Sequence, residues 1–340
     1  MIITLKNIVK DEDLIILKND LEKENISFIY LPGDNLNLYL SGSTSKLDKK
    51  RLMAYPFIEK VTSLTSPFRK VSRLIQPEDV IIKVGDVEIG RKDKVVMIAG
   101  PCAVESREQI FLIAGKVKEL GADMLRGGAY KPRTSPYSFR GLEEEGIKLL
   151  SEAGKKYNLP VVSELTTADN LDLFMKYVDV IQIGSRNMQN YELLRAVGKI
   201  NKPILLKRGF AATVEEWLLA AEYIMNEGNS KVILCERGIR TFENATRNTL
   251  DLSVVPLIHE ISSLPIIVDP SHGTGKWSLI EPMSLAGIAS GADGLIIEVH
   301  HDPEHALSDG GQSLTIENFK KTMVKGKLVA RALNKKLGND

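Results

Sequence analysis

The sequence predicts an α/β protein in which a (β/α)8 (TIM) barrel follows a small ferredoxin-like domain. Three observations predict this class. From residue 94 onward eight short apolar runs alternate with helical stretches, nearly every run ends on its C-terminal side in reactive residues, and residues 1–64 show the order βαββαβ. A doubly wound open sheet would give a similar alternation and remains the alternative.

The composition indicates a soluble, cytoplasmic protein. Lysine and arginine number 45 and aspartate and glutamate 44, a balance that argues against broad electrostatic capture of nucleic acid or of an anionic membrane. Two cysteines, Cys102 and Cys235, make no disulfide framework and fit a reducing compartment. The first residues lack the order of a secretory signal, and no apolar run approaches the roughly 18 residues of a membrane span. We therefore expect no nucleic-acid or membrane partner.

The first 64 residues predict a ferredoxin-like (ACT-like) regulatory domain. Three leucines between residues 14 and 21 fall on one face of an otherwise acidic helix, and leucines alternate at 36, 38 and 40 as in a half-buried strand. Such a unit often serves regulation or oligomerisation, and a purely structural appendage is the alternative. The six expected elements are strands at 1–6, 26–31, 36–40 and 57–64 and helices at 11–25 and 45–55.

Two segments join this domain to the barrel. Residues 65–79 contain prolines near both ends and no sustained period, which is typical of a linker. Residues 80–93 alternate around Gly85-Asp86 and predict a hairpin that caps the barrel. The barrel itself is expected over residues 94–340.

The barrel prediction depends on the apolar runs and the helices between them. Continuous apolar strands that alternate with helices indicate a parallel sheet covered on both faces. The runs occupy residues 94–100, 122–128, 160–165, 179–185, 203–209, 232–238, 265–272 and 294–300. Helical stretches between them include 105–120, 143–157, 214–227 and 282–290.

Nearly every run ends, on its C-terminal side, in residues capable of chemistry. In a barrel the C-terminal ends of the strands converge on one face, where the active sites of this fold lie. Solvation explains a single charge at a loop edge, but eight strands that behave alike indicate a site. The residues in these positions are Cys102, Arg126, Glu164, Arg186, Lys207, Arg208, Glu236, Arg237, Asp269, His272 and Glu298.

One group of candidate site residues is cationic and predicts anionic ligands. Clustered cations removed from water are unfavourable unless an anion offsets them, and the planar arginine side chain suits phosphate and carboxylate oxygens. We therefore expect small phosphorylated acids as substrates. The members of the group are Arg126, Lys131, Arg133, Arg186, Lys207, Arg208 and Arg237.

A second group offers ligands for a divalent transition metal. Cys102, His272, Glu298 and Asp309 would supply a thiolate, an imidazole and two carboxylates, a mixed shell that suits such an ion. These positions are far apart in the sequence, so no local ligand motif supports the site. The alternative is that these four residues do not form a common site.

Three other features are interpreted as structural. HGTGKW at 272–277 lacks the first glycine and the final Ser or Thr of a P-loop and predicts a strand-to-helix turn. The histidines of HHDPEH at 300–305 lie in a predicted loop and are left out of the metal group. Cys235 lies within an apolar run and is interpreted as a core thiol.

Seven motifs together resemble the type I 3-deoxy-D-arabino-heptulosonate 7-phosphate (DAHP) synthases. The likeness spans residues 94–325, and it is greatest to the microbial group whose barrel carries an N-terminal ferredoxin-like domain. The motifs are IAGPCAVES at 98–106, LRGGAYKPRTSPYSFRG at 125–141, IQIGSRN at 181–187, LLKRGF at 205–210, CERGIRTF at 235–242, DPSHGTG at 269–275 and EVHHDP at 298–303.

The resemblance implies a reaction and a role for each site residue. Phosphoenolpyruvate would condense with erythrose 4-phosphate and water to give DAHP and phosphate, the first step of the shikimate pathway of aromatic amino acid biosynthesis. Cys102, His272, Glu298 and Asp309 would hold the divalent ion, which could be manganese, iron or zinc. Lys131 would also donate a proton. Together with the ion ligands Cys102 and His272, it would form the set of catalytic residues. The phosphoenolpyruvate site would comprise Arg126, Lys131, Arg186, Lys207 and Arg237, and the erythrose 4-phosphate site Arg133, Thr134, Ser135 and Asp269.

The resemblance also implies regulation and assembly. The N-terminal domain of related synthases binds aromatic amino acids and mediates feedback inhibition. We therefore expect inhibition by tyrosine or phenylalanine through residues 1–64, and a homotetramer.

Three other functions compete with this interpretation. The sister enzyme 3-deoxy-D-manno-octulosonate 8-phosphate synthase uses arabinose 5-phosphate, but it typically carries Lys-Ala-Asn-Arg where this chain has Lys-Pro-Arg-Thr-Ser at 131–135. A Schiff-base aldolase with Lys207 as nucleophile would leave the four metal-type residues without a role. A non-enzymatic sensor would leave the reactive residues of eight strands unexplained.

Overall fold

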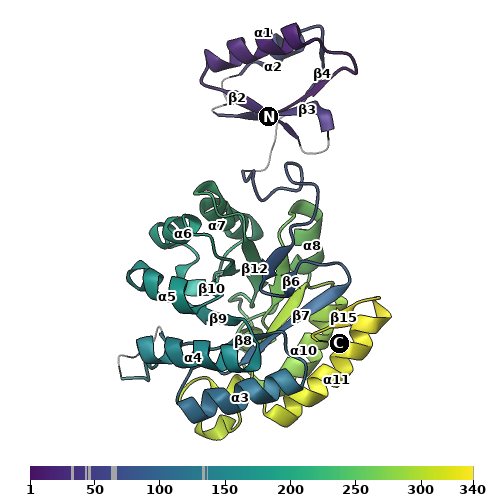
Figure 1. Ribbon diagram of the computed structural model, residues 1–340. Helices are drawn as coiled ribbons and strands as arrows, with labels where there is room; N and C mark the ends of the chain where they lie inside the picture. Colours follow the sequence, from purple (N-terminus) through teal and green to yellow (C-terminus); the bar gives the residue numbers. More distant parts are fainter. Residues whose placement is uncertain are drawn as a thin grey trace. The chain divides into compact units, whose positions relative to one another are not determined.

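The computed structural model describes residues 1–339 apart from 32–33, 43, 45–46, 63–66, 132–134 and 136. The chain divides into two compact units, Met1–Glu78 and Asp79–Asp340 (Figure 1). Each unit contains a hydrophobic cluster of its own.

The first unit is a four-stranded antiparallel sheet with two helices, in the sheet order β2-β3-β1-β4. Ile3 and Leu38 of the sheet pack in one cluster with Leu17 and Leu21 of the first helix. This arrangement confirms the predicted βαββαβ order. The elements are β1 (Ile2–Leu5), α1 (Asp11–Glu22), β2 (Ser27–Leu31), β3 (Asp34–Ser41), α2 (Lys49–Met53) and β4 (Ile58–Thr62).

The second helix of this unit is shorter than the prediction of residues 45–55. Helix α2 begins at Lys49 because the Asp48 side chain accepts a hydrogen bond from the Lys50 backbone N–H, which caps the helix. Residues 45 and 46 lie outside the described part of the chain. From residue 67 to 79, the described part of the expected linker forms neither helix nor strand.

Eight parallel strands form a closed barrel in the second unit. Strand β14 pairs with β7 from Gly294 to Glu298, and this pairing closes the sheet and excludes the open-sheet alternative. The strands are β7 (Lys94–Gly100), β8 (Met124–Arg126), β9 (Val161–Glu164), β10 (Val180–Ile183), β11 (Ile204–Lys207), β12 (Val232–Glu236), β13 (Ile266–Val268) and β14 (Gly294–Glu298).

Helices surround the barrel and cover its strands (Figure 1). All residues of β10, β11, β12 and β14 are buried, as expected for apolar strands covered on both faces. The helices are α3 (Arg107–Glu119), α4 (Glu143–Tyr157), α5 (Leu171–Tyr177), α6 (Tyr191–Gly198), α7 (Val214–Asn226), α8 (Val254–Ile261), α9 (Pro270–Thr274), α10 (Trp277–Ala289) and α11 (Ile316–Ala332).

A short hairpin precedes the barrel, with β5 (Ile82–Val84) and β6 (Val87–Ile89) joined through Gly85 at φ 58°. Its four apolar residues belong to the same hydrophobic cluster as Val96, Met124 and Leu205 of the barrel strands. The hairpin therefore packs against the barrel interior.

Two segments of the barrel differ from the prediction. The helix predicted at 282–290 begins earlier, at Trp277. Pro282 therefore lies inside the helix and not in its first turn, where the prediction places it. The first half of the turn predicted at 272–277 belongs to the short helix α9, which is capped by Asp269 and ended by Gly275 in the left-handed conformation at φ 69°.

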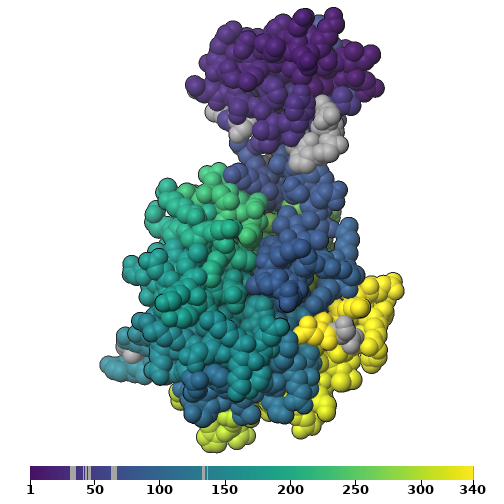
Figure 2. Space-filling model, viewed as in Figure 1, coloured from purple at the N-terminus to yellow at the C-terminus, as the bar shows by residue number. Residues whose placement is uncertain are grey.

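The C-terminal strand β15 (Lys336–Leu337) pairs with β7, the first barrel strand (Figure 1). Figure 2 shows the C-terminal residues, in yellow, on the surface of this unit. Within the described residues, no helix is both long and apolar enough to cross a bilayer.

Candidate active site

A cavity of about 350 Å³ lies at the C-terminal ends of the barrel strands. Its lining contains five basic side chains and two carboxylates, so it is suited to anionic ligands. Of the predicted substrate residues, Lys131, Ser135, Arg186, Lys207 and Arg237 line it. The other lining residues are Ser138, Glu164, Gly184, Ser185, Phe210, Arg247, His272 and Asp309.

Three of the four predicted metal ligands lie together beside this cavity. One ligand atom each from Cys102, Glu298 and Asp309 lies within 4.8 Å of the others. The Cys102 thiol donates a hydrogen bond to Asp309 Oδ2 at 3.3 Å. Cys102 follows β7, Glu298 ends β14 and Asp309 lies in the loop before α11, so the closure of the barrel brings them together.

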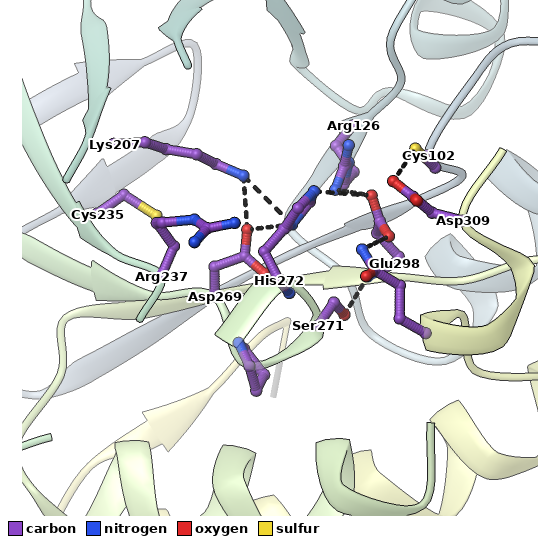
Figure 3. A network of polar contacts seen from close by, with 12 residues as sticks. Cys102, Arg126, Lys207, Cys235, Arg237, Asp269, Ser271, His272, Glu298 and Asp309 are labelled. Carbon is purple, nitrogen blue, oxygen red and sulfur yellow. Dashed lines mark hydrogen bonds and ion pairs between the residues drawn. The ribbon is translucent and has the colours of Figure 1, made fainter. Parts of the chain in front are cut away.

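The fourth predicted ligand, His272, joins this group through Glu298. Its Nε2 lies 3.4 Å from Glu298 Oε1, and its Nδ1 lies 2.7 Å from Asp269 Oδ2 (Figure 3). Burial lowers the pKa of His272 against the attraction of Asp269, which favours the neutral imidazole that a metal requires. A thiol, an imidazole and two carboxylates at these separations fit a divalent transition metal.

Glu298 is held in place by several donors. Arg126 Nη1 donates to its Oε1 at 2.9 Å, and Gln312 Nε2 donates to its Oε2 at 2.6 Å. Burial disfavours the charge on Glu298, but attraction to His272 and Arg126 lowers its pKa to about 2. The carboxylate is therefore ionised throughout the neutral range.

Lys131 connects the metal-type residues to the cavity. Its Nζ donates to Cys102 Sγ at 3.0 Å and to the Cys102 carbonyl at 3.1 Å, and the same side chain lines the cavity. Burial disfavours the ammonium, but the Cys102 sulfur and Glu164 raise its pKa above the ordinary value. Lys131 therefore keeps its charge and lies between the two groups of residues.

Arg237 is a buried cation that faces the cavity. It is 2% exposed, its Nη1 donates to the Gly238 carbonyl at 3.2 Å, and its Nε has no hydrogen-bond partner among the described residues. Burial lowers its pKa. A buried guanidinium with an unused donor is costly unless an anion binds to it.

Two predicted substrate residues do not line the cavity. Arg126 is 5% exposed and pairs with Glu298 behind it. Asp269 is fully buried, where it accepts a hydrogen bond from Lys207 at 2.5 Å and contacts His272. The predicted erythrose 4-phosphate residues Arg133 and Thr134 lie outside the described residues.

The assignment of Arg208 to the cationic group is wrong. Arg208 is buried and bridges Glu236 at 3.0 Å and Asp251 at 3.1 Å, with its guanidinium over the Trp217 ring. Successive residues of a strand point to opposite faces, so when Lys207 enters the cavity Arg208 points toward the helices.

Several residues of the site are absent from the predicted groups. Glu164 was expected at a strand end without a role, and it lines the cavity while accepting from Gln182 Nε2 at 3.2 Å. Arg247 donates to Gln312 at 2.6 Å and lies 3.7 Å from Asp309. Neither Arg247 nor Gln312 follows a strand directly, so the strand-end pattern cannot identify them.

Of the features interpreted as structural, the turn at 272–277 contains the metal-type residue His272, whereas His300 and Cys235 lie outside the metal-type cluster. His300 is buried beside Glu105, with its Nε2 3.3 Å from the carboxylate. Cys235 is fully buried, and burial raises the pKa of its thiol. Among the described residues, the only cluster with metal-ligand geometry is that of Cys102, Glu298 and Asp309.

Comparison with known proteins assigns the chain to a family. The family model described as "DAHP synthetase I family" matches residues 73–334. A Thermotoga maritima protein named phospho-2-dehydro-3-deoxyheptonate aldolase is 55% identical over 280 residues, which cover 82% of each chain. A 2-dehydro-3-deoxyphosphooctonate aldolase from Syntrophotalea carbinolica is 29% identical over 71% of this chain and 93% of its own length.

Solved structures support the same family. The crystal structure of the Thermotoga maritima DAHP synthase matches with a TM-score of 0.80 and 48% identity over 99% of both chains. A truncated form of the synthase from the same organism matches with a TM-score of 0.74 and 53% identity over 79% of this chain and 98% of its own. The chain therefore belongs to the DAHP synthetase I family and is an enzyme of the DAHP synthase class.

Proposed function

We propose that the protein condenses phosphoenolpyruvate with erythrose 4-phosphate and water to give DAHP and phosphate. The observation that carries this proposal is the cation-lined cavity directly beside Cys102, His272, Glu298 and Asp309. The cavity suits two phosphorylated substrates, and the adjoining residues suit a metal ion. The printed name of the 55% identical relative supports the same reaction.

Those four residues would hold a divalent ion of the manganese, iron or zinc class. When bound, such an ion acts as a Lewis acid that polarises the aldehyde of the sugar phosphate. The chain itself prepares the ligands: Arg126 and Gln312 fix Glu298, and Asp269 fixes the ring of His272.

The cationic residues would orient phosphoenolpyruvate. Lys207 faces the cavity from the end of β11. Arg186, Arg237 and Lys131 face it from the segments after β10, β12 and β8. Arg126 would act indirectly, through its ion pair with Glu298. Substrates held in attacking geometry lose much of the entropic part of the barrier.

The proposed reaction forms one carbon–carbon bond and one carbon–oxygen bond, and it cleaves the carbon–oxygen bond to phosphate. Carbon 3 of phosphoenolpyruvate attacks the aldehyde carbon, water oxygen adds at carbon 2, and phosphate leaves from carbon 2. Lys131 would donate the proton that the former aldehyde oxygen requires, since its Nζ lies at the edge of the metal-type cluster. Ser135, with Arg133 and Thr134, would hold erythrose 4-phosphate.

We also propose that the first unit makes the enzyme sensitive to tyrosine or phenylalanine, and that the protein is a cytoplasmic homotetramer. A ferredoxin-like unit with its own hydrophobic cluster supports an independent regulatory module. Size-exclusion chromatography with light scattering would test the assembly, and a monomer at assay concentration would contradict it.

The second candidate function is that of the enzyme that uses arabinose 5-phosphate. Relatives of this chain named 2-dehydro-3-deoxyphosphooctonate aldolase are 27–29% identical to it. The 55% identity to the heptonate enzyme favours DAHP synthesis. Comparison of product formation with each aldose separates the two, and a preference for arabinose 5-phosphate would reverse the assignment.

A further inference from the structure

We propose that Phe210 is a positioning residue, which holds the arginines of the phosphoenolpyruvate site at its ring and thereby sets the affinity for that substrate. The inference rests on the proposed function, because it takes Arg186 and Arg237 as ligands of phosphoenolpyruvate.

Three guanidinium groups surround the Phe210 ring. The guanidinium carbons of Arg186, Arg237 and Arg240 lie 5.5, 4.8 and 4.7 Å from its centroid. The negative face of an aromatic ring attracts such cations. Because three like charges repel one another, this cluster needs both the ring and an incoming anion to offset its charge.

The barrel topology places the ring between these arginines. Phe210 follows β11, Arg186 follows β10, and Arg237 and Arg240 follow β12, so the ring lies on the middle one of three adjacent strands. The Arg240 backbone N–H donates to the Phe210 carbonyl at 2.6 Å, which ties the two loops together. This hydrogen bond holds the backbone that carries the ring next to the loop that carries Arg240.

Arg237 contacts the ring while one of its N–H donors stays unused within the described part of the chain. Its Nη1 binds the carbonyl of the next residue, Gly238, and its Nε is unpartnered among the described residues. Arg186, Phe210 and Arg237 also line the same cavity. The ring can therefore orient both guanidinium groups while leaving their N–H donors to a phosphate or carboxylate.

The matched variants are Phe210→Leu, Phe210→Tyr and Phe242→Leu. At position 210, leucine keeps an apolar side chain but removes the ring, whereas tyrosine keeps the ring. Phe242 is fully exposed, so Phe242→Leu is a control for the same substitution away from the arginines. Steady-state kinetics would give kcat and both Michaelis constants, and calorimetry would give the dissociation constant of phosphoenolpyruvate.

We expect Phe210→Leu to raise the Michaelis and dissociation constants for phosphoenolpyruvate about tenfold while kcat changes less than about twofold. Phe210→Tyr should stay within about threefold of the native affinity, and Phe242→Leu should match the native enzyme. An unchanged affinity in Phe210→Leu, or an equal loss in the leucine and tyrosine variants, would overturn the inference.

A second series keeps the shape of the side chain in case the leucine variant does not fold. Fluorinated phenylalanines at position 210 withdraw electrons from the ring and weaken its attraction for cations with little change in size. Phosphoenolpyruvate affinity should fall stepwise with fluorination, and a constant affinity would contradict the proposal. If the native enzyme itself neither binds nor consumes phosphoenolpyruvate, the proposed function fails instead.

Discussion

Asp269 joins the two groups of residues that the sequence analysis separated. Its Oδ2 contacts both Lys207 and His272, and its Oδ1 accepts from the His272 backbone N–H at the start of α9. Burial disfavours its charge, but His272 and Lys207 hold its pKa well below the usual range. Asp269 is thus a fixed anion that positions one metal-type residue and one cation of the cavity lining.

The two cysteines should respond differently to substitution. Cys102→Ala removes the thiol from the metal-type cluster, so we expect activity and metal content to be lost while the fold remains intact. Cys235 lies in the core, so Cys235→Ala should keep its activity and metal content and lower the free energy of unfolding by about 1–2 kcal/mol. Metal analysis and activity of both purified variants test this, and full activity in Cys102→Ala would refute the metal assignment.

Metal affinity should increase with pH. Burial, followed by the charge of Glu298, raises the pKa of Cys102 to about 12, so the thiol is protonated at neutral pH. A metal binds the thiolate, and binding therefore releases a proton. Between about pH 6.5 and 8.5 the apparent affinity should rise by up to about tenfold per pH unit, as measured by metal titration of the chelated enzyme. A pH-independent affinity would show that this thiol is not a ligand.

At the scale of the elements, strand register decides which residues of a strand end enter the site. Lys207 and Arg208 are adjacent and both follow an apolar run, yet only Lys207 faces the cavity. The sequence could predict that β11 ends in cations but not which one points inward. Arg247 and Gln312 lie in long loops, whose path depends on tertiary contacts that no local pattern records.

The buried ion pair of Arg208 should contribute to stability and not to substrate binding. Arg208→Leu leaves Glu236 and Asp251 without their shared partner, which should cost about 3–5 kcal/mol. Arg107→Leu breaks an exposed pair with Glu152 and should cost about 0–1 kcal/mol. Denaturant unfolding followed by tryptophan fluorescence reports on the barrel, which contains both tryptophans.

The Michaelis constant for phosphoenolpyruvate separates this structural role from a role in binding. It should change less than about twofold in Arg208→Leu, because Arg208 does not line the cavity. A large increase without loss of stability would mean that Arg208 contacts the substrate.

At the scale of the whole molecule, the two units should be separable in function. A chain beginning at Asp79 retains the complete barrel and its hairpin, and a truncated form of the Thermotoga maritima synthase has been solved as a structure. We expect this truncated chain to keep catalysis and to lose inhibition by tyrosine or phenylalanine. Inhibition curves of both forms test this, and equal sensitivity would place the effector site in the barrel.

The fold could be predicted from the sequence because eight runs of apolar residues repeat one local pattern, and closure then follows from β14 pairing with β7. The two chemical groups could be predicted because strand ends converge. Their geometry could not, since Glu298 reaches Cys102 only after closure. A net charge of +1 likewise gives no sign of a cavity with five cations, because acidic residues elsewhere balance them.

We propose that this site condenses phosphoenolpyruvate with a four-carbon aldose with the help of a metal. The most direct measurement is phosphoenolpyruvate consumption with erythrose 4-phosphate or arabinose 5-phosphate, each with and without a strong chelator. We predict rapid consumption with erythrose 4-phosphate, little with arabinose 5-phosphate, and none after chelation until a divalent metal is restored. Preference for arabinose 5-phosphate, or full activity of the metal-free enzyme, would contradict the account.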